Sequence, residues 1–462
     1  MLAFSTLLGC TRGEIPARAA WIQQQLVLEN QVWIDREPDL VIQKFEKMGQ
    51  DPYDFMRGTT GLFYANIGRN DIERSSTKFL TEEAAGWVMV VGDPHPENFG
   101  TLPSLEHSLE VPWGWTDLDA ATYGPYLLDL RRLVLGTLML ARPLQGCENA
   151  CLSATAEQVA LGYVREIELL WSGAFTSLFS RILDDVEKEA REEGKERKRF
   201  HKYTEQFGDA DVRLSRFEAT EPLEKSHIEL TAEQQIQLDT LIDDLNSQIE
   251  SPVRLIDAVR RLGMGVNSFP ATRYIVLVDS GQPGPDDDRL LGIREMRNPA
   301  NVPTPNIGHP GWKDNGDRLQ FMADHLWPTD NGDDMFRGVR QGAMSFRTRS
   351  YLSWSQEIDH KKVAEAWASG NIDADDVAET ANMLGRGLAQ AHAGGKTARG
   401  GSALRAIARD IANGGGQAFV RERLRQAAED LEQLEMDHYT FQWLLDTQGA
   451  LIGAETTTEN IQ

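Results

Sequence analysis

The chain has 462 residues, of which 41% are hydrophobic and eleven are tryptophan, so it can bury a large core and divide into two lobes or domains. Its formal net charge of −24 argues against nucleic acid as the main partner, because a face that binds a phosphate backbone needs clustered Lys and Arg. No apolar run reaches the roughly 18 residues that a membrane-spanning helix requires.

The N-terminal segment allows two interpretations. The sequence Leu7-Leu8-Gly9-Cys10 closes an uncharged, weakly apolar stretch and resembles the end of a bacterial lipoprotein signal, although no charged residue precedes it. If Cys10 is lipidated after export, the protein belongs to the cell envelope and the lipid is its only membrane contact; the start codon then lies further upstream. Otherwise the stretch is a buried N-terminal segment of a cytoplasmic protein.

The first third of the chain alternates helical and extended patterns. Apolar residues at helical spacing predict a helix over residues 17–47, which Asp51-Pro52 ends. The apolar run 87–91 predicts a strand that ends in Gly92 and Asp93, and residues 111–116 predict a second strand that ends at Asp117. Residues 123–126 then read as a turn before a helix over 127–141.

Long helices are expected over residues 153–189 and 231–248, the second opened by a capping-box pattern at Thr231 and Gln234. Cys147 and Cys151 lie one helical turn apart without the further Cys or His of a zinc site. We therefore interpret them as structural thiols.

The sequence pattern changes near residue 253. A Gly-rich segment, 261–268, leads into an alternating strand at 272–278 and, after a turn, a second strand at 290–296. Beyond it we expect one extended piece at 344–354 and helices over 376–393 and 420–445.

Two groups of residues point to chemistry. Asp93, Asn98 five residues on, and Asp117 with Asp119 about twenty residues later are the residue types that metal-dependent phosphoryl transfer needs: one carboxylate for the acceptor hydroxyl, and oxygens for Mg²⁺. Without further information these are also ordinary turn carboxylates and a loop Asn.

The second group is a Gly-rich turn with a cation on a following strand, a combination that can cover nucleotide phosphates. Gly263 and Gly265 allow backbone to approach a phosphate without a Cβ, beside Ser268 and with Arg294 on the strand. The alternative is a plain hairpin turn.

The string Asp93-Pro94-His95-Pro96-Glu97-Asn98 resembles the catalytic loop of protein kinases and aminoglycoside phosphotransferases. Thr116-Asp117, followed by Gly124-Pro125 and Asp129-Leu130, resembles the metal-binding segment of the phosphotransferases. Residues 45–450 as a whole resemble a bacterial family, domain of unknown function 2252, through these motifs, Asp54-Phe55-Met56-Arg57-Gly58 and the segment that ends in His392.

This resemblance implies a two-lobed, kinase-like α+β fold, with a mostly helical large lobe and a small β-rich lobe for the nucleotide. Its parts are in exchanged order, because the loop and metal Asp come first and the Gly-rich hairpin comes last, so we expect a circular permutation. The expected divisions are 1–16 as lipoprotein signal remnant and tether, 17–250 as the catalytic-loop part, 251–360 as the hairpin part and 361–462 as C-terminal helices that complete the large lobe.

The resemblance also assigns roles to residues. Asp93 orients the acceptor hydroxyl, Asn98 and Asp117 bind Mg²⁺, and Asp119 is a second ligand or a turn carboxylate. Structural support falls to three residues: Asp129 through backbone N–H groups, His95 as loop architecture rather than a general base, and Arg57 in an internal ion pair. The alternatives are Arg57 as a phosphate partner and Asp129 as an ordinary carboxylate at a helix start. Arg294 departs from the family pattern, which has Lys there, and Arg presents a planar fork where Lys presents a point charge.

The predicted activity is therefore transfer of a phosphoryl group from ATP, with Mg²⁺, to an unknown hydroxyl acceptor. The alternative is a pseudokinase-like module that binds a nucleotide or a partner with weak or no turnover, which Arg294 favours. A weaker third hypothesis is a carboxylate-metal hydrolase built on His95, Asp117 and Asp119.

Overall fold

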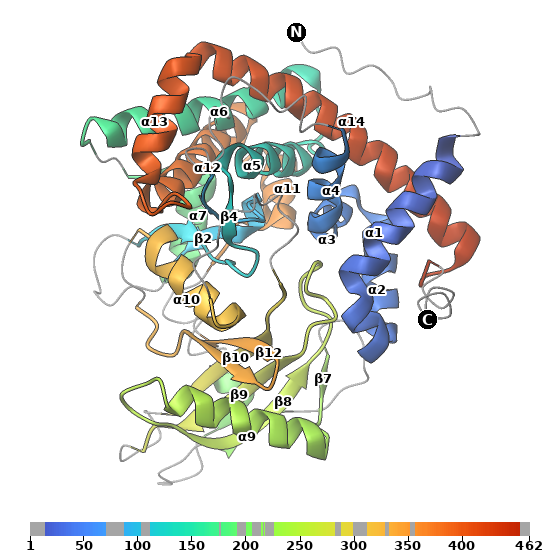
Figure 1. Cartoon of the computed structure of the whole chain (residues 1–462), viewed down its shortest axis with the longest axis vertical. Helices are drawn as coiled ribbons and strands as arrows, with labels where there is room; N and C mark the ends of the chain where they lie inside the picture. Colours follow the sequence, from blue (N-terminus) through green and yellow to red (C-terminus); the bar gives the residue numbers. More distant parts are fainter. Residues whose placement is uncertain are drawn as a thin grey trace.

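The helical patterns at both ends of the chain fold into one helical body, and the segment between them contributes an antiparallel sheet below it (Figure 1). The computed structural model describes residues 14–70, 87–102, 111–174, 177–191, 200–205, 214–215, 217, 226–281, 288–298, 312–328, 332–351 and 356–452. The α+β class is thus as expected, whereas Cys10 lies outside the described residues.

The helical body is organised around α5 (Tyr126–Ala141), all of whose residues are buried. Helices α6 and α12 pack side by side next to it, and α14 crosses them. Most of the large hydrophobic core lies among these helices. The helices of the body are α1 (Glu14–Arg36), α2 (Pro38–Gln50), α3 (Pro52–Gly58), α4 (Thr60–Asn70), α5, α6 (Asn149–Trp171), α7 (Arg181–Arg191), α10 (Asn315–Leu326), α11 (His360–Ala368), α12 (Ala374–Gly394), α13 (Ala403–Gly414) and α14 (Gly416–Gln448).

The main sheet has six antiparallel strands in the order β11-β12-β10-β9-β8-β7. Alternation along the strands gives it an apolar face, on which α9 (Ala232–Asn246) packs through Leu238 and Leu241. Part of the opposite face is covered by Tyr203, and the rest faces the helical body. The strands are β7 (His227–Ile228), β8 (Arg254–Arg261), β9 (Arg273–Asp279), β10 (Arg289–Glu295), β11 (Arg337–Gln341) and β12 (Met344–Ser350).

Two small antiparallel pairs within the helical body hold the motifs predicted to be catalytic. Strand β1 (Trp87–Val90) pairs with β4 (Thr122–Pro125), and β2 (Phe99–Thr101) pairs with β3 (Trp113–Trp115). The loop after β1 leads through the 3₁₀ turn η1 (Pro96–Asn98) into β2 and lies next to the loop after β3, since the N–H of Thr116 donates to the carbonyl oxygen of Asn98 (2.9 Å). A further short pair is β5 (Thr204–Glu205) with β6 (Leu214–Ser215).

Several expected elements need correction. The single helix over 17–47 is two helices, because Pro38 has no N–H to donate and its ring clashes with a preceding carbonyl. The helix over 153–189 is divided as well, after Trp171, where Gly173 adopts φ +78°. Residues 123–126 were expected to be a turn, but Thr122–Pro125 is a strand that completes a pair with β1.

The two cysteines at the start of α6 also differ from expectation. Cys147 and Cys151 are joined by a disulfide rather than present as thiols, with their Cα atoms 5.1 Å apart, which lies within the ordinary range for such a bond. Cys147 precedes the N-cap residue Glu148 and Cys151 lies in the first turn of α6, so the bond ties the chain that enters the helix to the helix itself.

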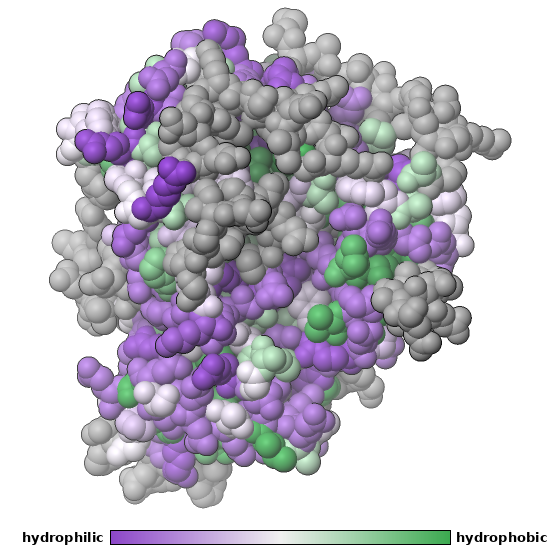
Figure 2. Space-filling model, in the orientation of Figure 1, coloured by the Kyte–Doolittle hydropathy of each residue, from purple (hydrophilic) through white to green (hydrophobic). Residues whose placement is uncertain are grey.

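The capping prediction is confirmed: Thr231 and Gln234 form a capping box at the start of α9. The start of α12 is capped by Asp373, with Asp376 as the reciprocal partner. No helix among the described residues has the length and apolar character to cross a bilayer. Where its residues are described, the face in Figure 2 is mainly hydrophilic, with scattered hydrophobic side chains.

Candidate functional site

The loop after β1 is positioned by a glycine and a buried carboxylate. Gly92 has φ +82°, and a Cβ on it would lie 2.1 Å from the carbonyl oxygen of Ala120. Asp129 at the start of α5 accepts hydrogen bonds from the N–H groups of Val91 (2.6 Å) and Gly92 (3.0 Å). Asp129 thus supports the loop backbone and is 1% exposed, too buried to meet a substrate.

Asp129 is also the end of a buried polar chain. Its Oδ2 lies 3.1 Å from Nε2 of His392 at the end of α12, and Nδ1 of His392 lies 2.8 Å from the hydroxyl of Tyr163 on α6. The C-terminal motif that ends in His392 therefore packs directly on the loop after β1, although some 300 residues separate them in sequence. Buried polar groups joined in this way fix one arrangement of the helices.

Asp93 itself is engaged on both oxygens. Arg132 donates to Oδ1 from Nε (2.7 Å), with Nη2 at an ion-pair distance of 2.6 Å from the same oxygen, and the Thr60 hydroxyl donates to Oδ2 (3.0 Å). Burial opposes ionisation, but the charge of Arg132 outweighs it and lowers the pKa of Asp93. This is an ionised carboxylate in a buried ion pair, whereas a general base would need an open oxygen.

Asn98 is placed by the same loop. Its Nδ2 donates to the carbonyl oxygen of Asp93 (3.0 Å), and the side chain is only partly buried. His95 between them is 3% exposed, and burial lowers its pKa to about 4, so it is neutral at pH 7. A neutral, enclosed His95 fits loop architecture better than proton transfer.

Arg57, near the end of α3, forms ion pairs with two carboxylates. Its Nη1 lies 2.5 Å from Oε2 of Glu97 and 3.4 Å from Asp54. The other oxygen of Glu97 lies 2.5 Å from Nδ1 of His360 at the start of α11. The ligand atoms of Glu97, Asp359 and His360 lie within 4.8 Å of one another, but Glu97 already has two cationic partners.

The loop after β3 holds two carboxylates, Asp117 and Asp119, which we call the acid pair and which contact the sheet directly. Asp117 Oδ1 accepts from Nη2 of Arg294 on β10 (2.8 Å), and the same nitrogen donates to Asp119 Oδ2. Arg318 on α10 holds the acidic loop from behind by donating to the backbone carbonyl of Asp119 (2.8 Å). Asp119 Oδ1 is buried and accepts no hydrogen bond among the described residues, and its nearest cation is Nη1 of Arg347 at 3.5 Å.

Arg294 is the centre of a row of three arginines on adjacent strands. In the sheet register it lies directly opposite Arg273 on β9 and Arg347 on β12. Nη1 of Arg347 lies 3.6 Å from Asp117 and 3.5 Å from Asp119, further than the contacts of Arg294. Like charges directly opposite one another destabilise a sheet. The three guanidinium groups have two carboxylates beside them, so the group as a whole carries an excess of positive charge.

The pKa shifts of this row follow from burial and from that excess. Burial lowers the pKa of Arg347 to about 10, and the neighbouring Arg294 adds to the effect. Burial likewise lowers the pKa of Arg273, again with Arg294 contributing. For Arg294 burial also acts downward, but Asp117 and Asp119 outweigh it and raise its pKa. Burial would raise the pKa of Asp117, but Arg294 and Arg347 outweigh it and hold that pKa well below its ordinary value.

The Gly-rich turn joins this group through Arg273. Nη2 of Arg273 donates to Oγ of Ser268 (2.6 Å) and to the carbonyl oxygen of Met264 (3.1 Å). Gly263 and Gly265 have φ values of +63° and +76°, which only glycine adopts readily, and Gly265 is exposed. The turn connects the antiparallel strands β8 and β9, so it is a hairpin turn that also lies next to the arginine row.

The space between the sheet and the helical body is a cavity of about 1100 Å³. Arg57, Gly265, Arg273 and Arg294 line it together with the start of α11. Five of its lining residues are Asp or Glu and ten are Lys or Arg, in a chain whose net charge is −24. The ten cationic residues are Lys47, Arg57, Lys202, Arg261, Arg273, Arg294, Arg347, Arg349, Lys361 and Lys362.

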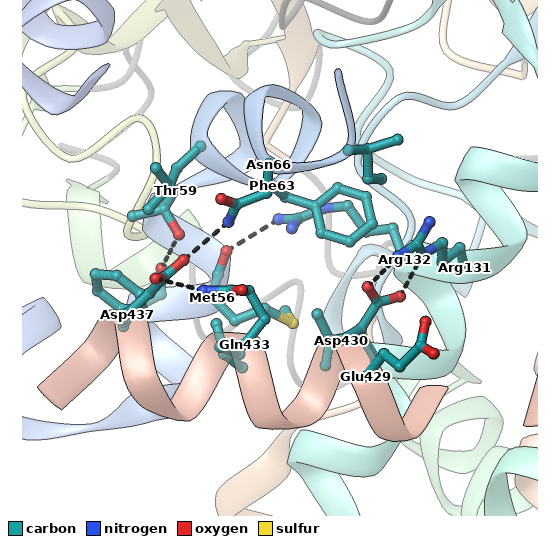
Figure 3. Close-up of a pocket in the computed structure, with 15 residues that line it drawn as sticks. Met56, Thr59, Phe63, Asn66, Arg131, Arg132, Glu429, Asp430, Gln433 and Asp437 are labelled. Atoms are coloured by element: carbon teal, nitrogen blue, oxygen red, sulfur yellow. Dashed lines mark hydrogen bonds and ion pairs between the residues drawn. The ribbon is translucent and has the colours of Figure 1, made fainter. Parts of the chain in front are cut away.

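A second cavity, of about 210 Å³, lies on the far side of Arg132 between α3, α4, α5 and α14 (Figure 3). Arg131 and Arg132 both border it: Arg131 pairs with Asp430 on α14 (2.5 and 2.6 Å), and Arg132 turns toward Met56 and Asp93. None of the residues predicted from the sequence to form the site, among those described, lines this second cavity.

The structure therefore brings together Asp117, Asp119, Arg294 and, through Arg273, the Gly-rich turn. Asp93 and Asn98 share a neighbouring loop. Neither these two residues nor Asp117 and Asp119 line the large cavity, which the acid pair borders only through Arg294 and Arg347. Sequence reasoning missed Arg132, Arg273 and Arg347. The Asp129-Leu130-Arg131-Arg132 motif contained a signal for Arg132, whereas Arg273 and Arg347 emerge only from the sheet register.

Comparisons with known proteins agree with the family resemblance. No curated protein and no solved structure matches the chain. The model of one family, described as "Uncharacterized protein conserved in bacteria (DUF2252)", matches residues 36–443. This match covers most of the chain and includes the acid pair, the loop after β1, the arginine row and the segment ending in His392, so the chain belongs to the DUF2252 family.

Proposed function

We propose that this protein is an ATP- and Mg²⁺-dependent phosphotransferase whose reaction takes place in the cleft between the sheet and the helical body. The observation that carries the proposal is the pair Asp117 and Asp119 facing the buried arginine row, next to a Gly-rich turn. Phosphoryl transfer is catalysed mainly by positioning and by charge stabilisation, and this arrangement offers both acidic metal ligands and cations for phosphate oxygens.

The architecture supports a permuted kinase-like fold. A small antiparallel sheet with one packed helix, α9, stands opposite a larger helical body, and the acid pair lies between them. Helix α1 packs along α14, with Arg18 paired to Asp437 at 2.7 Å. The two ends of the helical body are therefore neighbours, which is the condition under which a chain can be permuted without loss of its core.

The residues fit a divalent cation. Asp117, Asp119 and the side-chain oxygen of Asn98 would hold Mg²⁺, and the buried Asp119 Oδ1, which accepts no hydrogen bond among the described residues and has only Arg347 at 3.5 Å as an ion-pair partner, is an oxygen suited to a metal. The ion would neutralise charge on the nucleotide phosphates. In this structure Arg294 binds the two carboxylates that would hold Mg²⁺. When the ion is bound, the planar guanidinium of Arg294 would instead donate to phosphate oxygens, whose geometry it matches.

In the proposed transfer, the acceptor hydroxyl oxygen bonds to the γ-phosphorus while the bond from that phosphorus to the β–γ bridging oxygen breaks. ADP leaves with the electron pair, and the hydroxyl proton is released to water in the cleft. Asp93 contributes a fixed negative charge and holds Asn98 through its backbone, rather than acting as a free base, since both its oxygens are taken.

The second candidate is a binding module with weak or no turnover. The Asp93–Arg132 ion pair favours it, because it removes the open base that an active enzyme would use. The disulfide between Cys147 and Cys151 favours it too, because disulfides persist in oxidising compartments, where ATP is scarce.

Thermal unfolding and turnover of the full chain separate these candidates. Mg²⁺-ATP at a hundred times its dissociation constant should stabilise the wild type by about 2.7 kcal/mol. Asp117→Asn should lose the contribution of Mg²⁺ and retain binding of metal-free nucleotide, since the arginine row stays intact. Asp243→Asn, an exposed carboxylate on α9, is the matched control and should behave as the wild type.

Turnover is then measured as ADP release under the same conditions. Stabilisation with turnover that Asp117→Asn abolishes supports the phosphotransferase, and stabilisation without turnover supports the binding module. If Mg²⁺-ATP at millimolar concentration shifts neither protein, both nucleotide-based candidates are wrong.

A further inference from the structure

The large cavity holds more positive charge than a bound nucleotide would need. Its ten cationic residues face five carboxylates, or seven when Asp117 and Asp119 are added. The arginine row of Arg273, Arg294 and Arg347 accounts for only part of this charge. Of the remaining cations, Arg261 and Arg349 lie on strands of the sheet, whereas Lys47, Arg57, Lys361 and Lys362 lie on helices of the helical body.

Arg261 and Arg349 form the centre of this second group. Arg349 lies two residues beyond Arg347 on β12 and therefore projects from the same face of the sheet, opposite Gly292 on β10. Arg261 ends β8, and its Nη1 donates to the hydroxyl of Tyr351 (2.5 Å). Both arginines line the cavity, as do Lys202 and Tyr351.

The sheet is shaped so that this second group can meet. A Cβ on Gly292 would lie 3.5 Å from the ring of Tyr351, so the ring lies over the strand where a side chain is missing. This brings the hydroxyl of Tyr351, the residue after β12, across the sheet to Arg261 on β8. Nε of Arg261 is buried and meets no acceptor among the described residues, which leaves donor capacity next to the cavity.

We propose that the cavity has two anion subsites, and that the second, built from Arg261, Arg349 and Tyr351, binds a phosphate group of the acceptor. This inference rests on the proposed function, in which the arginine row takes the nucleotide phosphates. The acceptor is then a small molecule that carries a phosphate group as well as the hydroxyl that is modified. Planar guanidinium forks with a tyrosine hydroxyl match the several oxygens of a phosphate.

Calorimetric titration of the full chain with inorganic pyrophosphate tests this directly. Pyrophosphate should bind at two sites per chain. Arg294→Gln should weaken one of them at least tenfold, and the pair Arg261→Gln with Arg349→Gln should weaken the other by a similar factor. Arg254→Gln, at the opposite end of the same strand as Arg261 and exposed, is the matched control and should leave both sites unchanged.

The two proposals fail in different ways. If Mg²⁺-ATP displaces neither pyrophosphate, the proposed function is wrong whatever the number of sites. If only one pyrophosphate binds, or if the double substitution at Arg261 and Arg349 changes nothing, the second subsite does not exist. If citrate binds the second site as tightly as pyrophosphate, the site does not select phosphate and the proposed acceptor class is wrong.

Discussion

At the scale of single residues, the ion pair of Asp93 and Arg132 is the contact that links the N-terminal motifs. Arg132 is fully buried, and besides Asp93 it donates to the Met56 carbonyl and the Thr60 hydroxyl (both 3.0 Å). Asn267 from the segment after the Gly-rich turn donates to the same Thr60 hydroxyl (3.0 Å). One side chain thus connects α3, α4, the loop after β1 and the sheet.

Replacing Arg132 should therefore be costly. In Arg132→Met the carboxylate of Asp93 stays buried without its cation, and removal of one partner of a buried pair typically costs about 3–5 kcal/mol. Chemical denaturation measures the loss. Adding Asp93→Asn should recover part of it, because the uncompensated charge is gone. Lys188→Met, which breaks an exposed pair with Asp184, should not change the unfolding free energy measurably.

A second residue pair makes stability depend on pH. The hydrogen bond to Glu97 raises the pKa of His360 above its ordinary 6.5. Although burial opposes it, His360 together with Arg57 lowers the pKa of Glu97 from 4.5 to about 2. The pair is fully charged in the folded state between these limits. Its stabilisation is complete between about pH 4.5 and 6.5, is lost as the pH rises through the higher folded pKa of His360, and is lost as the pH falls toward 2 and Glu97 is protonated.

His360→Asn should accordingly have a lower melting temperature than the wild type, and this difference should be largest between about pH 4.5 and 6.5. The difference should close as the pH rises through the raised folded pKa of His360, because the wild-type side chain then loses its charge. In a Glu97→Gln background the same substitution should show no such pH dependence. A gap that persists undiminished in alkaline solution would contradict the assigned pair.

At the scale of elements, the turn at Gly92 decides where the loop after β1 can go. Gly146 has a similar φ, +86°, but a Cβ there meets nothing within 4 Å, whereas at Gly92 it meets the Ala120 carbonyl. Gly146→Ala should cost about 1–2 kcal/mol from the left-handed backbone alone. Gly92→Ala should cost roughly 1–3 kcal/mol more, because backbone must shift to relieve the overlap.

Urea denaturation of the two variants measures this difference, with Gly146→Ala as the matched control. Equal losses in the two variants would mean that the close approach of Gly92 to Ala120 is not a constraint on the fold. A larger loss at Gly92 would show that the chain reversal before Asp93 depends on the missing side chain.

The same scale shows what the sequence could predict. Strand β1, helix α5 and helix α9 with its capping box are local features, and their positions follow from apolar spacing and from the residues at their ends. Strand β4 looked like a turn because Tyr123-Gly124-Pro125 has turn composition, and only its pairing with β1 makes it extended. Strand β8 was missed, since its charged residues hide the alternation.

The residues of the site also divide into those that motifs in the sequence identified and those that only the folded structure brings together. Asp117, Asp119 and Arg294 were named from motifs, and the structure brings them into contact. That Arg294 would bind these carboxylates could not be predicted, because the contact joins residues 177 positions apart in the chain. Arg273 and Arg347 belong to the row only through strand register, which a single residue of slip would reverse.

At the scale of the whole molecule, the sheet and the helical body meet through charged side chains as well as apolar ones. Arg36 of α1 pairs with Glu295 on β10, and Arg260 on β8 pairs with Glu37 between α1 and α2 (both 2.5 Å). Together with Arg294 and the acid pair, these contacts place a positively charged cleft inside a strongly acidic protein. The cleft therefore concentrates anions that the rest of the surface repels.

Such a cleft should cost stability when no anion is bound, and Arg347 is the residue at which this can be measured. Its pKa is lowered to about 10, which means that the folded protein disfavours its charge. Arg347→Met keeps an apolar side chain of similar length and should stabilise the unliganded protein by roughly 0.5–2 kcal/mol. The stabilisation by pyrophosphate should become smaller at the same time, and Arg340→Met on the exposed strand β11 should change neither quantity. If Arg347→Met instead destabilises the unliganded protein and leaves the pyrophosphate effect intact, Arg347 is a partner of Asp117 and Asp119 rather than part of an anion site.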